Sequence, residues 1–277
     1  MGFMLNLAPD GTILAPVLTP PPADTHKYAR GSAVIVSGPA LHTGASRLSA
    51  EAALAVGAGL VTIVGNHAAL TEHAAHVTAI MLRERDAEFS VVDDRVRSLL
   101  IGPGAGVSDD LVQDVAALLM RKIPMVLDAD ALTAFSAKPE MLFAILHDKA
   151  VLTPHEGEFA RLFPDLSLDD RAKAASDASV RAGAVVLLKG AETAIAAPDG
   201  RFAINRHASP WLATAGSGDV LAGLICGLLA QGNSAFDAAA IACWLHGDIG
   251  VRAGPGLTAD AMPAHLPLVL QGILQDA

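Results

Sequence analysis

The amino-acid sequence predicts an α/β protein with three layers, α/β/α, around a central, mainly parallel sheet. Short runs of β-branched and aliphatic residues alternate along the chain with alanine-rich runs of helical length. This alternation is typical of buried strands that are joined by covering helices. Hydrophobic residues make up 52% of the 277 residues but aromatic residues only 4%, so we expect a closely packed core of small aliphatic side chains.

Each predicted element follows from a change in this pattern. Buried strands are expected at residues 32–37, 60–64, 98–102, 124–128, 150–153 and 184–190, and helices at 44–57, 108–121, 217–231 and 235–252. Residues 193–205 contain two alternating runs that flank Pro198-Asp199-Gly200. The turn chemistry of these three residues predicts a β-hairpin.

The chain length alone would allow two domains, but neither a proline- or serine-rich linker nor an internal repeat divides the sequence. Residues 1–26 carry several prolines and show no helical or strand periodicity. We therefore expect an N-terminal leader at 1–26 that is extended or partly disordered. Residues 27–277 are expected to form one domain.

Charge and hydropathy exclude several classes of protein. The chain has 19 basic and 29 acidic residues, a net charge of −10, whereas nucleic-acid binding needs a basic excess. The longest uncharged apolar stretch, 220–231, is too short to span a bilayer, and the N-terminus lacks the basic region of a secretory signal. Cys226 and Cys243 lie in apolar helical runs, as buried thiols do. We expect a soluble, cytoplasmic protein with no nucleic-acid or membrane partner.

The segment Gly216-Ser217-Gly218-Asp219 lies directly before the apolar run 220–231. Its glycines permit a tight turn that exposes backbone N–H groups at a helix N-terminus, which favours an anion such as phosphate. Asp219 has two interpretations, because a carboxylate there can complement the helix dipole or act as a general base. A base that removes a hydroxyl proton during attack on a phosphoryl group must lie beside such an anion hole.

The segment 216–219 resembles the GxGD signature of the ribokinase-like superfamily. Further motifs narrow the resemblance, namely 44–48, 52–54, 57–61, 101–106, 127–132, 152–158 and 188–191. In this order and spacing they resemble the ADP/ATP-dependent NAD(P)H-hydrate dehydratases over about residues 27–275. Glu156 stands where the family usually has proline, and Ala215 where it usually has glycine. Neither departure removes a side chain with an assigned catalytic role.

The resemblance implies a catalytic role for four residues and a substrate role for five. Asp219 is the base, and the backbone amides of Gly216, Ser217 and Gly218 form the anion hole. The hydrate substrate is expected to contact Ala45, Gly104, Gly106, His155 and Asp219. Gly104 and Gly106 follow a predicted strand end, where open α/β sheets bind ligands.

The resemblance also implies that Lys189, Gly190, Ala191, Glu192 and Thr193 bind the adenine nucleotide together with Gly218. The residues alone leave two of these roles open. Lys189 could be a solvated lysine at a strand edge, and His155 could be a structural histidine near a helix that Thr153 caps.

Other titratable residues have less specific interpretations. Asp128 and Asp130 have the spacing of carboxylates beside a metal, yet Asp130 could equally be the N-cap of a helix. His73 and His76 share a helix face, which favours a surface pair because no third ligand is near. His246 could be a buried hydrogen-bonded histidine or could line the nucleotide pocket. No residue is assigned as a metal ligand.

The function that the resemblance implies is an ADP-dependent (S)-NAD(P)H-hydrate dehydratase, a carbon–oxygen lyase of metabolite repair. Phosphorylation of the hydrate hydroxyl and elimination of phosphate would yield NAD(P)H, AMP and phosphate, with ADP or ATP as co-substrate and Mg²⁺ as cofactor. The alternatives are a small-molecule kinase of the same superfamily, of the hydroxyethylthiazole or hydroxymethylpyrimidine type, and a catalytically silent nucleotide-binding protein. We expect a homotetramer, and a separate epimerase that acts in the same pathway.

Overall fold

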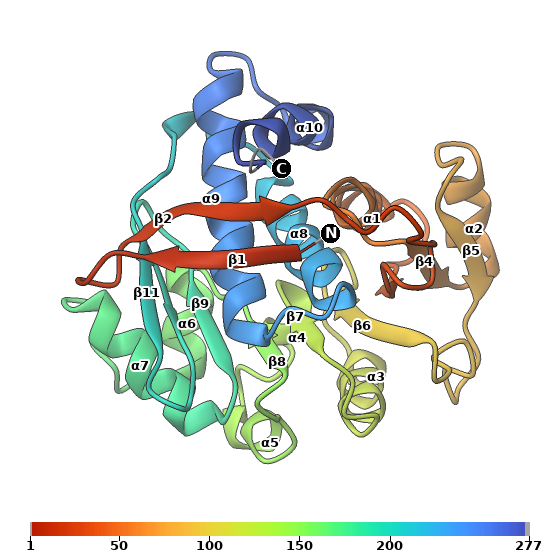
Figure 1. Cartoon of the computed structure of the whole chain (residues 1–277). Helices are drawn as coiled ribbons and strands as arrows, with labels where there is room; N and C mark the ends of the chain where they lie inside the picture. The colour runs from red at the N-terminus through yellow and green to blue at the C-terminus, as the bar shows by residue number, and fades with distance from the viewer. Residues whose placement is uncertain (1, 275–277) are drawn as a thin grey trace.

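The structure, a computed structural model, describes residues 2–274. Met1 and residues 275–277, the end of the predicted domain, lie outside this range. Figure 1 shows a central sheet with helices on both faces and a separate N-terminal hairpin. The strands are β1 (Gly2–Leu7), β2 (Ile13–Thr19), β3 (Ser32–Val36), β4 (Leu60–Gly65), β5 (Met81–Glu84), β6 (Val96–Ile101), β7 (Met125–Leu127), β8 (Ala150–Leu152), β9 (Val185–Leu188), β10 (Thr193–Ala196) and β11 (Phe202–Asn205).

The helices lie between these strands and at the C-terminal end of the chain. They are α1 (Gly44–Ala55), α2 (His67–Ala74), α3 (Asp109–Leu119), α4 (Asp130–Thr133), α5 (Pro139–Phe143), α6 (Glu156–Leu162), α7 (Arg171–Ala182), α8 (Ser217–Ala230), α9 (Ala235–Ala253) and α10 (Met262–Gly272), with 3₁₀ turns at Pro210–Leu212 and Ala259–Ala261. The predicted alternation of strands and helices is confirmed.

Within residues 2–274, nine strands form the main sheet in the order β11-β10-β9-β8-β7-β6-β3-β4-β5. From β9 to β5 in this order, all neighbouring strands pair parallel. The strands β9, β10 and β11 pair antiparallel, which confirms the predicted hairpin. The chain leaves β3 for β4 on one side and later returns to β6 on the other side. The carboxyl ends of β3 and β6 therefore form a topological switch point, where open α/β sheets bind ligands.

Alternate side chains of each strand face two separate cores. In β3, Ala33 and Ile35 belong to the first core, whereas Val34 and Val36 belong to the second. The first core contains side chains of α1, α8, α9 and α10, and the second contains side chains of α3, α4, α5, α6 and α7. The three-layer α/β/α architecture is thus confirmed.

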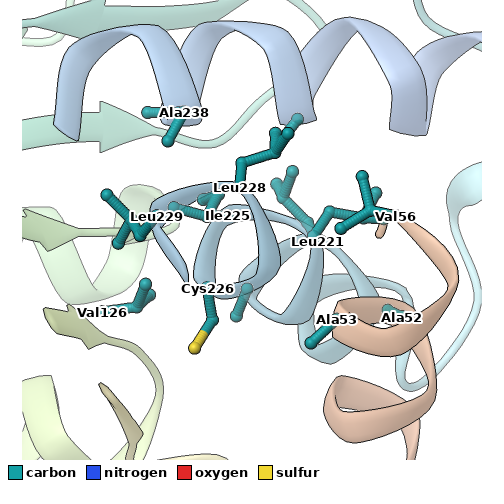
Figure 2. Packing of buried hydrophobic residues seen from close by; sticks show 14 of the residues in the cluster. Ala52, Ala53, Val56, Val126, Leu221, Ile225, Cys226, Leu228, Leu229 and Ala238 are labelled. Carbon is teal, nitrogen blue, oxygen red and sulfur yellow. The ribbon is translucent and has the colours of Figure 1, made fainter. Parts of the chain in front are cut away.

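Helix α8 lies in the middle of the first core, between α1, α9 and the sheet (Figure 2). Its approach to α1 depends on glycine, because a Cβ on Gly223 would lie 2.2 Å from the carbonyl oxygen of Ser49. The hydroxyl of the same Ser49 donates a hydrogen bond of 2.9 Å to the carbonyl of Asp219. This close contact fixes the N-terminal turn of α8, and with it Asp219, against α1.

Residues 2–19 contain regular structure that the sequence analysis did not predict. β1 and β2 pair antiparallel, and the hairpin lies across α9 (Figure 1). Ile13 and Leu18 are buried in the first core, and the Leu18 N–H donates to the carbonyl of Ile273 at 3.1 Å. The sequence pattern did not reveal these two strands, because their order comes from their pairing and from packing against α9.

Candidate active site

The loop before α8 forms a backbone site that suits an anion. Gly216 adopts the left-handed conformation with φ of 89°, and a Cβ there would lie 2.6 Å from a methyl carbon of Leu48. Only glycine allows both the turn and this contact. Of the described residues, none accepts a hydrogen bond from the amides of Gly218 or Asp219. These free N–H groups and the helix dipole together favour a bound phosphate.

Asp219 lies in the first turn of α8 with a perturbed carboxyl group. Burial, followed by the nearby charge of Asp128, raises its pKa to about 6, while Lys189 acts in the opposite direction. A further increase comes from Asp130. Asp219 is therefore a stronger base than an ordinary aspartate but still ionised near neutral pH. A perturbed carboxylate beside an anion site is typical of a catalytic base.

Lys189 lies just beyond β9 and points toward the start of α8. Its Nζ donates to Asp128 Oδ1 at 2.8 Å, and a Cβ on Gly218 would lie 3.6 Å from the same Nζ. Burial opposes the charge of Lys189, but the pairing with Asp128 and the charges of Glu158 and Asp219 together outweigh it, so that the pKa of the lysine is raised. Lys189 is thus a charged group at the anion site rather than the solvated lysine that the residues alone allowed.

A cavity of about 710 Å³ opens beside this lysine. Four of the five predicted nucleotide residues at 189–193 line it, together with Gly218: Lys189, Gly190, Ala191 and Thr193. Glu192 does not line the cavity, and its carboxylate instead pairs with Arg206 at 3.4 Å. The cavity has the size of a small-molecule site and presents the charge that a nucleotide phosphate needs.

Residues 208–210 and 212–214 also line the cavity, and the sequence analysis assigned them no role in the site. Asp248 of α9 holds this segment in place through a contact of 2.9 Å with His207 Nε2. Gly247 permits close packing, since a Cβ there would lie 1.7 Å from the carbonyl oxygen of His207. Nothing in the local sequence marks these contacts, because they join residues about 40 positions apart.

His246 both lines this cavity and forms a buried hydrogen bond, so the two interpretations from the sequence hold together. Its Nε2 lies 2.9 Å from Ser217 Oγ. Burial lowers the pKa of His246 to about 4, so the ring is neutral near neutral pH. The contact ties α9 to the first residue of α8.

The predicted hydrate loop lies at the switch point. Gly38, after β3, packs on the Gly104 loop so closely that a Cβ would lie 1.9 Å from the Gly104 carbonyl oxygen. A Cβ on Gly104 would lie 3.5 Å from that of Ala45. The Gly106 N–H donates to Asp130 Oδ2 at 2.8 Å. The structure therefore brings Ala45, Gly104 and Gly106 together, and Asp130 connects their loop electrostatically to Asp219.

His155 serves as the N-cap of α6 in a capping box. Its Nδ1 accepts from the Gly157 N–H at 2.9 Å, and the Glu158 carboxylate accepts from the His155 N–H at 2.9 Å. This assigns the cap to His155 rather than to Thr153. The His155 side chain is 56% exposed, so the ring is also accessible to a ligand.

His73 differs from its expected surface position. The side chain is fully buried in α2, with Nε2 2.8 Å from Ser37 Oγ. Burial lowers the pKa of His73 to about 4. The predicted surface pair of His73 and His76 is therefore wrong, because α2 packs this face against the end of β3.

The carboxylates of Asp128 and Asp219 fit a magnesium ion that arrives with a nucleotide. Each is a hard oxygen ligand, and after burial the charge of Asp128 is the next cause of the raised pKa of Asp219, so the two carboxylates lie near one another. Mg²⁺ usually binds one or two carboxylates together with substrate phosphates. Within 2–274, no group of three His, Cys, Asp or Glu side chains could hold a metal alone. Over the same range, no helix has the length and hydropathy required to cross a membrane.

The parallel sheet, its covering helices and the anion site at α8 define a ribokinase-like protein. A ribokinase-like superfamily protein from Enterococcus faecalis has a TM-score of 0.81 and 27% identity, over 94% of this chain and 93% of that one. A family model described as NAD(P)H-hydrate dehydratase matches residues 33–270. The chain belongs to the NAD(P)H-hydrate dehydratase family.

Individual relatives agree with this assignment. A bifunctional NAD(P)H-hydrate repair enzyme from Moorella thermoacetica is 39% identical, over 92% of this chain and 52% of the relative. The chain thus spans about half the length of the curated relatives it matches. An ADP/ATP-dependent NAD(P)H-hydrate dehydratase from Bacillus subtilis, co-crystallised with ATP and Mg²⁺, has a TM-score of 0.80 and 25% identity, over 93% of this chain and 95% of that one.

Proposed function

We propose that this chain is an ADP-dependent (S)-NAD(P)H-hydrate dehydratase, a carbon–oxygen lyase that repairs hydrated NADH and NADPH. The observation that carries the proposal is the position of Asp219, a carboxylate with a raised pKa, between an anion site and the switch-point loop. Membership of the dehydratase family supports the same substrate class. The ligand contacts of the predicted site residues, including Glu192 and His155, are part of this proposal.

The reaction begins with removal of the hydroxyl proton of the hydrate by Asp219. The hydroxyl oxygen then attacks the terminal phosphorus of ADP, and AMP leaves. The amides near Gly218 and the charge of Lys189 stabilise the transferring phosphoryl group. Phosphate, a far better leaving group than hydroxide, then departs from the ring carbon while the neighbouring carbon loses a proton, which restores the double bond of NAD(P)H.

The two ligands occupy different parts of the site in this proposal. ADP or ATP lies in the cavity beside Lys189, and the hydrate lies against Ala45, Gly104, Gly106 and His155. Asp128 or Asp219 would hold Mg²⁺ together with the nucleotide, and the ion would supply positive charge that neutralises the phosphates. The Bacillus subtilis relative co-crystallised with ATP and Mg²⁺ supports these co-substrate and ion assignments.

The cellular setting extends the proposal. We place the enzyme in the cytoplasm as a homotetramer, with a separate epimerase that interconverts the hydrate epimers in the same pathway. Sedimentation at working concentration measures the oligomer, and a tetramer is the expected result.

Product analysis distinguishes the dehydratase from the small-molecule kinase. Incubation of the chain with NADH hydrate, ADP and Mg²⁺ should restore the absorbance of reduced nicotinamide and release one AMP and one phosphate for each hydrate consumed. A kinase would instead leave a stable phosphorylated product. A hydroxyethylthiazole kinase from Pyrococcus horikoshii shares the fold, with a TM-score of 0.63 at 17% identity, which does not assign its substrate to this chain. If the chain binds ADP but does not restore the absorbance of reduced nicotinamide, the proposal is refuted.

A further inference from the structure

A second large cavity lies at the opposite edge of the sheet from the candidate active site. Its volume is about 760 Å³, compared with about 710 Å³ for the nucleotide cavity. It is lined where β6, β7, β8 and β9 begin, by the turn between β10 and β11, and by the adjoining ends of α8 and α9. Neither the dehydratase reaction nor the nucleotide uses this edge of the sheet.

The cavity carries a local excess of positive charge in a chain with a net charge of −10. Arg97, Lys122 and Lys149 line it, and no carboxylate of residues 2–274 pairs with any of the three. A fourth cation, Arg201, is paired with Asp199 at 2.8 Å. With Asp148 also in the lining, four cationic and two acidic side chains leave a net charge of about +2.

The start of α9 adds to this positive potential. Helix α9, 19 residues long, begins at the cavity, and Ala235 and Phe236 of its first turn belong to the lining. The positive end of its dipole lies there, partly offset by Asp237 in the same turn. The cavity therefore disfavours a further positive charge and favours an anion.

The remainder of the lining is apolar. It includes Val96, Ile123, Pro124 and Phe236, and the guanidinium carbon of Arg201 lies 5.0 Å from the centre of the Phe236 ring. An apolar floor beside unpaired cations suits a ligand with an organic body and a charged end. A bare inorganic ion would use only the charged part of such a site.

We propose that this cavity is a second ligand site, which binds a small phosphorylated metabolite through Arg97, Lys122 and Lys149. The lysines and the arginine donate to the phosphate group, and the organic part covers the apolar floor. The site is separate from the reaction assigned above. The first cavity is lined by the start of α8, the middle of α9 and the residues that follow β9, whereas the second is lined by the end of α8 and the starts of α9 and β9. A ligand bound in the second cavity therefore contacts elements that also form the nucleotide site.

Lys122 offers an unusually clean test variant. Its backbone has φ of 56°, a left-handed conformation that favours glycine, so Lys122→Gly removes the charge while it relieves backbone strain. Combined with Lys149→Ala, it removes two of the three unpaired cations without a change in the core. Lys173→Ala is the matched control, because Lys173 is an exposed lysine outside the cavity lining that pairs with Asp177 at 2.6 Å.

The experiment is calorimetric titration of ADP-saturated chain with inorganic pyrophosphate, which presents the phosphate groups alone. We expect one pyrophosphate per chain, at least tenfold weaker binding to the double variant, and less than a twofold change with Lys173→Ala. Thermal melting must show that the variants are folded. Absence of binding to the wild type, or equal affinity of the wild type and the double variant, would overturn the proposal. If Lys189→Ala, rather than the double variant, abolished pyrophosphate binding, the pyrophosphate would be assigned to the active site and the proposal would also be overturned.

Discussion

Replacement of Asp219 by asparagine should stabilise the folded chain at neutral pH. In the folded state the pKa of Asp219 is raised from 3.8 to about 6, mainly because the carboxyl is buried. The folded state therefore favours the protonated carboxyl. Ionisation above pH 6 costs free energy in the folded state but not in the unfolded chain, so it lowers the free energy of unfolding. A difference of about 2 pKa units corresponds to about 3 kcal/mol at pH 7.5. The amide of asparagine carries no charge, so Asp219→Asn should recover up to that amount.

The stability that Asp219→Asn is expected to add depends on pH and decreases as the pH falls. As the pH falls from 7.5 through 6 toward 4, the folded state takes up a proton before the unfolded state does, so the advantage of Asp219→Asn shrinks to about half at pH 5. Urea unfolding of both proteins without ligands, at pH 7.5 and pH 5, measures it.

A second carboxylate provides a control with the opposite sign. A hydrogen bond from Arg181 lowers the pKa of exposed Asp165 to about 2, so Asp165→Asn should not stabilise the chain at pH 7.5. If Asp219→Asn were no more stable than the wild type at pH 7.5, the burial of an ionised Asp219 would be refuted.

Four further variants test separate parts of the structure. Lys189→Ala should weaken ADP binding about tenfold or more in calorimetry while hydrate affinity changes little, since it removes a charge-assisted contact; unchanged ADP affinity would return Lys189 to a structural role. Gly106→Asn should weaken hydrate binding, and asparagine is chosen because it tolerates the φ of 77°. Gly218→Val should instead reduce turnover. If each variant weakened the binding of hydrate and of ADP equally, the assignment of two distinct ligand loops would be contradicted. Gly223→Ala should destabilise the fold by about 1–3 kcal/mol in urea unfolding, because its Cβ meets the Ser49 carbonyl, and an unchanged midpoint would contradict that contact.

Much of the fold could be predicted because the information is local. Strands such as β3 and β9 are buried on both faces, and their sequences are continuous aliphatic runs. The edge strand β5 (Met81–Glu84) is largely exposed and carries charged residues, so it has no such signal. Helix α7 was also missed, since its buried face consists mainly of alanines, although Asp170 as its N-cap was a usable signal.

The candidate site was predictable only where a motif was contiguous. The turn at 216–219 and its helix are encoded by adjacent residues. Contacts such as Lys189 with Asp128, 61 positions apart, depend on the order of strands in the sheet. Arg171, the first residue of α7, donates to the carbonyl of Lys189 at 2.8 Å. This contact could not be predicted, because the sequence analysis did not identify α7.

The measurement that tests the central claim most directly is turnover of NADH hydrate with ADP and Mg²⁺ by the wild type and by Asp219→Asn. Loss of general-base catalysis should lower turnover by about two to four powers of ten. Calorimetry should show ADP affinity that is nearly unchanged, and wild-type turnover should decline as the pH falls below about 6, where Asp219 becomes protonated. Wild-type turnover in folded Asp219→Asn would contradict the assignment of Asp219 as the base.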